Sequence, residues 1–287
     1  MAIAAVPPFR PYAPPTSETC PMTNPVLIEA ADGIVTLTLN RPEHRNPISD
    51  MDMIDALVAA LENLNEDPAA RVAILTGAGR GFSSGGNVKA MAGAGGRAAA
   101  SPHSNREWYR TGVQRIPRAF EALEVPAIAA VNGAAVGAGC DLACLCDLRI
   151  ASTEASFAES FVKLGLIAGD GGAWLLPRIV GQARAREMAF TGDAISAEQA
   201  LAYGLVSQVV APEELMPAAR ALAARIAVNP PIAVRMTKRL MREAERADLE
   251  TVLQLSGAMQ SIAHATADHA EAVEAFVAKR TPKFGDS

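Results

Sequence analysis

The segment PAIAAVNGAAVGAGCD, residues 126–141, indicates more about the fold than any other part of the chain. Its first half, Ala127–Val131, is a continuous apolar run, which is typical of a strand buried on both faces. Asn132-Gly133 then marks a turn, and the small residues after it favour the start of a helix. A buried strand that leads through such a turn into a helix predicts an α/β architecture.

Further apolar segments extend this pattern in both directions along the chain. Val26–Glu29 and Ile34–Leu39 flank the turn signal Asp32-Gly33 and therefore predict a hairpin. Ser49 is the expected N-cap of a helix that runs to the break at Asp67-Pro68. Further strands are predicted at Arg71–Thr76, Leu148–Ala151 and Leu205–Val210.

The sequence divides into three parts by composition and periodicity. Residues 1–25 are rich in proline and lack the apolar stretch of a signal peptide, so we expect an unstructured extension. Residues 26–211 alternate strands with helices and are expected to form the α/β core. Residues 212–287 have a helical pattern and are predicted to form a C-terminal helical subdomain. No apolar run approaches the ~20 residues that a transmembrane helix needs.

The charge balance limits the classes of partner. With 26 basic and 31 acidic residues the net charge is −5, which argues against a nucleic-acid or membrane surface. Cys140, Cys144 and Cys146 are close in sequence, but no histidine or second pair completes a zinc set. We therefore expect core-filling thiols, no metal, and a reduced, cytoplasmic chain.

Two glycine-rich loops follow predicted strands and carry the first functional signal. The first, Gly79–Lys89, lacks both the Gly-Lys-Ser/Thr ending of a phosphate loop and the third glycine of a dinucleotide loop. The second is Asn132–Asp141. Each could aim one backbone N–H at a single oxygen and so form an oxyanion hole. A flexible surface turn in the first loop, and close helix–strand packing in the second, are the alternatives.

A set of motifs in fixed order resembles the enoyl-CoA hydratase/isomerase (crotonase) superfamily, from about residue 26 to the C-terminus. They are Asn40-Arg41-Pro42, Phe82–Gly86, Pro126–Gly133, Gly137–Leu142, Cys146-Asp147, Thr191–Asp193 and Gly204–Val206. The resemblance implies a crotonase-like fold of repeated β-β-α units with a helical C-terminal region. It also implies homotrimers or dimers of trimers, and no permanently bound cofactor.

The resemblance further implies an acyl-CoA substrate whose thioester oxygen accepts two backbone N–H bonds. Aligned by motif, those N–H groups belong to Gly86 and Ala138, although the family more often has glycine at the second position. Arg45, Ser84 and Lys89 are the implied contacts for the coenzyme.

The carboxylates are expected to decide the reaction. Hydratases of this family use two glutamates to position and activate water. Asp141 occupies the position of the first glutamate and is shorter but still acidic. Phe161 occupies the position of the second and cannot transfer a proton. Glu159, two residues earlier, could substitute only if the loop were rearranged, and we expect an ordinary surface glutamate instead. For Asp141 the alternative to catalysis is a first-turn acid that complements a helix dipole.

Another carboxylate, Asp170, follows Leu166 and precedes Trp174 in a stretch that resembles ring-opening isomerases of phenylacetyl-CoA breakdown. Those enzymes also carry phenylalanine at the position of Phe161, but their aspartate matches Gly169. The alternative for Asp170 is a helix N-cap. Phe161, Leu166 and Trp174 are the expected walls of an apolar acyl pocket that raises a carboxyl pKa.

The leading hypothesis is proton-transfer isomerisation of an enoyl-CoA, with Asp141 and Asp170 as candidate bases. Hydration with Asp141 as the single carboxylate is the next alternative, and dehalogenation is a third. A relative that binds acyl-CoA or RNA without catalysis is the alternative from another class, and the acidic charge balance argues against RNA.

Overall fold

The computed structural model describes residues 24–92 and 96–285. The predicted extension, residues 1–25, lies outside the described residues except for its last two positions. The larger sheet has the strand order β1-β2-β3-β4-β6-β9. β1 and β2 are antiparallel, as the predicted hairpin requires, and the remaining pairs are parallel. Its strands are β1 (Val26–Ala31), β2 (Ile34–Leu39), β3 (Val72–Gly77), β4 (Ala127–Val131), β6 (Leu148–Ser152) and β9 (Gln208–Val210).

A second, smaller sheet contains the strands β5-β7-β8. These are β5 (Ala134–Val136), β7 (Ser156–Ala158) and β8 (Ile195–Ser196). β4 continues into β5 and then into helix α5 (Ala138–Leu145), and β6 continues into β7, with helix α6 (Gly172–Val180) after it. The expected repetition of strand, strand and helix is thus present. The short strand β5, which sequence analysis did not predict, lies between the Asn132-Gly133 turn and α5.

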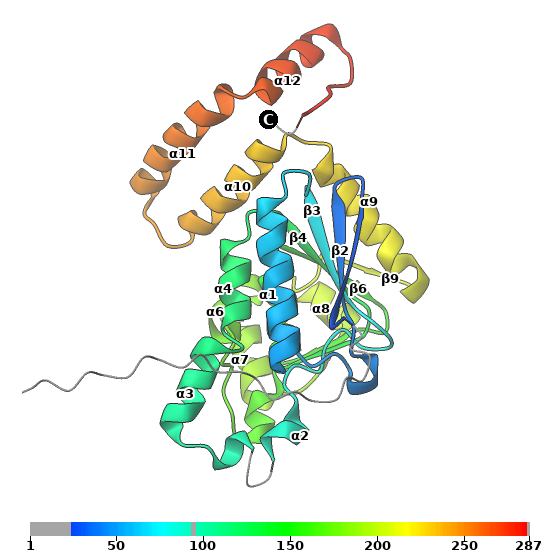
Figure 1. Ribbon diagram of the computed structural model, residues 1–287, viewed down its shortest axis with the longest axis vertical. Coiled ribbons are helices and arrows are strands. Elements are labelled where there is room, and N and C mark those ends of the chain that lie inside the picture. The colour runs from blue at the N-terminus through cyan, green and yellow to red at the C-terminus, as the bar shows by residue number, and fades with distance from the viewer. Residues whose placement is uncertain (1–23, 93–95, 286–287) are drawn as a thin grey trace, which may run out of the picture.

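Helices cover both faces of the larger sheet (Figure 1). α1 (Met51–Glu66) and α4 (Arg115–Ala122) pack with α5 on one face, where most of the buried apolar side chains gather. α1 begins one residue later than predicted, because Asp50 rather than Ser49 is its N-cap residue. The Ser49 hydroxyl instead accepts the N–H of Asn87 at 2.8 Å.

The opposite face is covered by α9 (Leu215–Ala227), whose Leu215, Ala219 and Ala223 recur every four residues and pack on Ile74 and Ile128. Small side chains on this stripe let the helix approach the sheet closely. The other helices are α2 (Val88–Met91), α3 (Pro102–Thr111), α7 (Gln182–Thr191), α8 (Ala197–Ala202), α10 (Pro231–Ala244), α11 (Leu249–His264) and α12 (Ala267–Ala278). Short 3-10 turns are η1 (Pro42–His44), η2 (Arg97–Ala99), η3 (Ser160–Leu164) and η4 (Pro212–Glu214).

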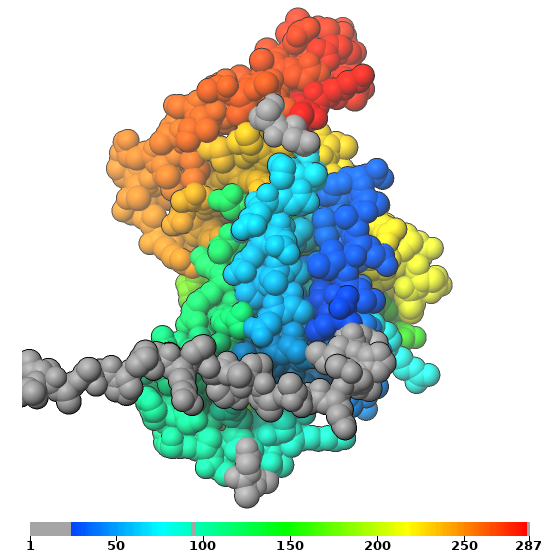
Figure 2. All heavy atoms as spheres, in the orientation of Figure 1, coloured from blue at the N-terminus to red at the C-terminus, as the bar shows by residue number. Residues whose placement is uncertain are grey.

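The last three helices form a lobe at one end of the molecule, coloured from orange to red in Figures 1 and 2. α10 attaches this lobe to the core through basic side chains that donate to loop carbonyls. Arg235 reaches the carbonyl of Ala70 at 3.1 Å, Lys238 that of Val125 at 2.8 Å, and Arg242 that of Leu123 at 2.9 Å. The division of the chain at residue 211 stays a prediction.

Candidate active site

The two glycine-rich loops meet directly. Ser83 of the first loop pairs with Ala135 in a parallel bridge, and its carbonyl accepts the N–H of Val136 at 3.0 Å. Gly85 has a φ of +75°, and a Cβ added there would lie 2.3 Å from the carbonyl oxygen of Val136 and 2.8 Å from the nitrogen of Ala138. Only glycine permits both this dihedral and this approach. The Gly85–Gly86 peptide therefore lies against the start of α5.

The N–H groups of Gly86 and Ala138 are the available donors at this junction. Among the described residues, neither group donates to an acceptor. Ala138 is the first residue of α5, so its N–H has no partner within the helix, whereas those of Cys140 and Asp141 donate to the carbonyl of Gly137. Two free N–H groups on adjoining loops can stabilise one oxyanion. The role of these two groups as an oxyanion hole stays a prediction.

Asn46 holds the first loop in place, a role that sequence analysis did not identify. This residue is fully buried, and its side-chain amide donates to the carbonyls of Ala78 and Gly81, both at 2.9 Å. Its own carbonyl accepts the Ser83 hydroxyl at 2.8 Å, and that hydroxyl accepts the N–H of Gly85 at 3.1 Å. These bonds fix the backbone immediately before the Gly86 donor.

A small pocket of about 100 Å³ opens beside the two N–H groups. It brings together six of the predicted site residues, namely Ser84, Gly86, Ala138, Phe161, Leu166 and Asp170. The Phe161 ring lies over the start of α5, 3.6 Å from where a Cβ on Gly137 would be. The rest of the lining is mostly apolar, with Met91, Trp108 and Val113 among its members.

Among the described residues that line this pocket, Asp170 is the one acidic side chain. It is only 6% exposed, and its Oδ1 has no hydrogen-bond partner among the described residues. Burial raises the pKa of Asp170 to about 6, with a further contribution from the charge of Glu159. The N-cap alternative is wrong, because Gly171 is the N-cap residue of α6 and no side chain caps it. Asp170 is therefore free to act on a ligand.

Asp141 lies behind the pocket and is not among its lining residues. It occupies the first turn of α5, as the dipole alternative predicted, and is completely buried. A Cβ added at Gly172 would lie 1.9 Å from its Oδ1, so the carboxyl abuts the start of α6. Packing of α5 against α6 thus directs this side chain into the protein interior.

Glu159 is 2% exposed, so the expectation of a surface glutamate was wrong. Its side chain interacts with those of Asp141 and Cys140. Burial raises the pKa of both carboxyls, and the charge of Glu159 raises that of Asp141 further. No N–H or hydroxyl of the described residues reaches either oxygen of Asp141. Both carboxyls are therefore easier to protonate than exposed acids are.

Tyr109 of α3 is a pocket residue that the sequence did not reveal. Its ring would be 2.6 Å from a Cβ at Gly169, so no side chain fits at Gly169. Gln114 fixes the same segment by donating to the carbonyl of Gly169 at 3.0 Å. The pKa of Tyr109 is raised, first by burial and then by the charge of Asp170. The ring therefore occupies the space that a side chain at position 169 would need.

Three other predicted site residues lie outside the pocket. Trp174 lines a different cavity, where Arg178 and Arg246 stand 4.0 and 5.4 Å from its ring centre. The helical turn of α6 directs it away from Phe161. Arg45 is exposed, and its carbonyl accepts the N–H of Ser84 at 2.8 Å. Lys89 is exposed on α2. Coenzyme contacts by Arg45, Ser84 and Lys89 stay predictions.

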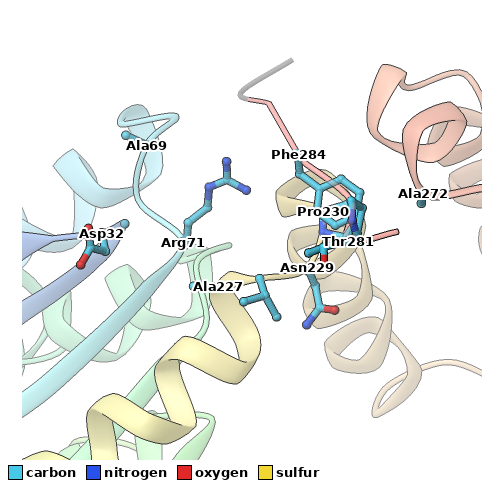
Figure 3. A pocket seen from close by; sticks show the side chains of 12 residues that line it. Asp32, Ala69, Arg71, Ala227, Asn229, Pro230, Ala272, Thr281 and Phe284 are labelled. Atoms are coloured by element: carbon cyan, nitrogen blue, oxygen red, sulfur yellow. The ribbon is translucent and has the colours of Figure 1, made fainter. Parts of the chain in front are cut away.

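A larger cavity of about 920 Å³ has none of these carboxylates in its lining (Figure 3). It is bounded by Asp32, Arg71, the α9–α10 junction at Asn229-Pro230, and Phe284. Its lining contains no buried acid, so it has no candidate base comparable to Asp170 in the pocket beside Gly86.

Within residues 24–92 and 96–285, no group of three or more acidic, histidine or cysteine side chains could hold a metal ion. No helix in the same part of the chain has the length and apolarity needed to cross a bilayer.

Comparison with known proteins agrees with this geometry. The sequence model described as enoyl-CoA hydratase/isomerase matches residues 29–287. The chain is 40% identical to 1,2-epoxyphenylacetyl-CoA isomerase of Escherichia coli (strain K12) over 260 residues, which cover 90% of this chain and 97% of that protein. It is 35% identical to crotonyl-CoA hydratase of Syntrophomonas wolfei over 260 residues, which cover 90% of this chain and 97% of that protein. The crystal structure of an enoyl-CoA hydratase from Bacillus anthracis superposes with a TM-score of 0.85 at 35% identity, covering 92% of this chain and all of that one.

Proposed function

The chain belongs to the enoyl-CoA hydratase/isomerase family, and we propose that it isomerises an enoyl-CoA by proton transfer, with Asp170 as the base. The observation that carries this proposal is the single carboxylate in the pocket, next to two free N–H groups. The relatives include hydratases as well as an isomerase, so membership of the family leaves the reaction open.

In this proposal the thioester oxygen of the substrate accepts the N–H groups of Gly86 and Ala138. The Asp170 carboxylate removes a proton from the acyl carbon beyond the double bond, and the electron pair moves through the conjugated system to the thioester oxygen. The two N–H groups stabilise the resulting dienolate, each by about 3 kcal/mol. Return of the proton to the α-carbon re-forms the thioester and shifts the double bond.

The pKa of Asp170 suits this role. At about 6 it leaves the carboxyl ionised near neutral pH, yet far more basic than an exposed aspartate. Asp141 and Glu159 would act from behind the pocket. In addition to burial, the charge of Glu159 raises the pKa of Asp170 and so makes it a stronger base towards the substrate proton.

The arrangement supports isomerisation over hydration. Water activation in the family's hydratases requires glutamates that face the substrate, and here Phe161 occupies one such position. Asp141, at the other, is fully buried behind the pocket. Coenzyme A enters as part of the substrate, and we expect no permanent cofactor.

A homotrimer or homohexamer is part of the same proposal. Large apolar side chains on α11 and α12 are exposed, among them Leu249 at 75% and Phe276 at 85%. Contiguous exposed apolar side chains favour association.

Replacement of Asp170 by asparagine tests the assignment. Asp170→Asn keeps the size of the side chain but cannot accept a proton, so double-bond migration should slow by about 10²–10⁴-fold. Asp193→Asn is the matched control, because Asp193 is exposed and pairs only with Lys163 at 2.7 Å. Migration at the wild-type rate in Asp170→Asn would overturn the role of this residue.

A further inference from the structure

A second cavity lies on the other side of Phe161 from the pocket beside the oxyanion donors. Its volume is about 340 Å³, against about 100 Å³ for the first pocket. Phe161 lines both. The second cavity lies between η3, the segment after it, α6 and α7, and its remaining lining is mainly apolar, including Val162, Ile167, Leu176, Ala189 and Phe190.

The wall between the two cavities is one residue thick. Ser160 lines the first pocket and Glu159 the second; Leu166 lines the first and Ile167 the second. At the start of α6 the same alternation separates Asp170 from Gly172. Only the Phe161 side chain faces both spaces, so a change of its rotamer is the simplest way to join them.

The sizes of the two cavities bear on the acyl group. A protein cavity of ~150 Å³ holds one benzene molecule. The first pocket is smaller than that, so it can take only a few carbons beyond the thioester. The second cavity has more than twice the volume of such a benzene site. Ile167 and Phe190 line it and are 81% and 75% exposed. Exposed side chains of this kind gain most when an apolar group covers them.

We propose that the second cavity binds the distal apolar end of a medium-length acyl or aryl-alkanoyl group, and that Phe161 controls its access. This inference rests on the acyl-CoA substrate of the proposed function but not on the reaction. Glu159 lines the same cavity, but it is already 2% exposed and faces Asp141. Because the Glu159 carboxyl is already shielded from water, an apolar group bound in the cavity would remove little further hydration from it.

Saturated acyl-CoAs test the proposal, because they have no double bond to move and report binding alone. For the wild-type protein we expect calorimetric affinity to rise from butyryl-CoA to decanoyl-CoA, by up to about fourfold for each buried methylene group. Ala189→Phe on α7 fills the cavity and should weaken decanoyl-CoA binding at least tenfold, with butyryl-CoA unaffected. Ala183→Phe is the matched control, because Ala183 is exposed on the same helix and does not line the cavity.

Phe161→Ala should act in the opposite direction and strengthen decanoyl-CoA binding relative to butyryl-CoA. Circular dichroism checks that each variant is folded. Wild-type affinity for butyryl-CoA is expected of Ala189→Phe and Ala183→Phe, but not of Phe161→Ala, because Phe161 also lines the first pocket. If Ala189→Phe fails the folding check, Ala173→Leu on α6 fills the cavity from another side. Equal effects of Ala189→Phe and Ala183→Phe on decanoyl-CoA, or no gain in affinity with chain length, would overturn the proposal. Neither result would bear on Asp170, whose role is tested by double-bond migration.

Discussion

Burial in the folded protein makes the negative charge of the Asp170 carboxylate unfavourable. Its folded-state pKa of about 6 exceeds the ordinary value of 3.8, so the folded protein binds this proton more tightly than the unfolded chain does. The contribution of the neutral carboxyl to stability is therefore complete below about pH 4 and is lost as the pH rises through about 6. The same ionisation that lowers stability supplies the base, so the rate should fall as the pH drops below about 6.

Asp170→Asn removes this ionisation. The variant should match the wild type in stability near pH 4 and exceed it above pH 7 by up to about 3 kcal/mol. Urea unfolding at the two pH values measures the difference. A variant that is less stable than the wild type at both would contradict the burial of an unpaired charge at this site.

Single side chains were the least predictable part of the site. The sequence proposed Gly86, Ala138 and Asp170, which line one pocket, because glycine-rich loops and acids are recognisable by residue type. Their roles stay predictions. Glu159 looked like a surface residue, because one glutamate between short strands carries no sign of the cysteine and aspartate that meet it in space. Tyr109 belongs to α3, a polar helix, and only the tertiary fold brings its ring over Gly169.

Helix α5 links the buried strands to the chemistry. Its N-terminus offers the Ala138 N–H because the first residues of any helix lack internal partners. Proline is well tolerated at this first position and removes only the N–H. Ala138→Pro should therefore keep the helix but lower kcat/KM by about 10²–10³-fold.

The control for this change is Ala267→Pro, at the first position of α12, which is exposed and far from the pocket. Circular dichroism should show equal helix content in the two variants, with activity lost in Ala138→Pro alone. Full activity in Ala138→Pro would exclude this N–H as a thioester donor.

Elements were predicted well where the pattern was local and strong. The hairpin β1–β2 and the strands β3, β4 and β6 follow from short-range signals, and the structure confirms each. The strand expected at Leu205–Val210 is shorter, covering only Gln208–Val210, because its first residues are buried in the turn after α8. β5 was missed because three residues are too few to show a distinctive period, and its partners, β7 and Ser83, come from other parts of the chain.

The whole molecule combines a core covered by helices on both faces of the sheet with a C-terminal lobe on which large apolar side chains are exposed. We expect light scattering to give the mass of three or six chains. Phe276→Asp, at a side chain that is 85% exposed, should shift this mass towards a single chain without loss of secondary structure. A single-chain mass for the wild type would contradict the proposed oligomer.

The isotopic content of the product tests the central claim most directly. The protein would be incubated with a panel of enoyl-CoAs in water labelled with deuterium and oxygen-18, and the product masses followed. Isomerisation through Asp170 predicts a shifted double bond, deuterium on carbon and no oxygen-18. A product that gains one water and carries oxygen-18 would show hydration instead and contradict the assignment.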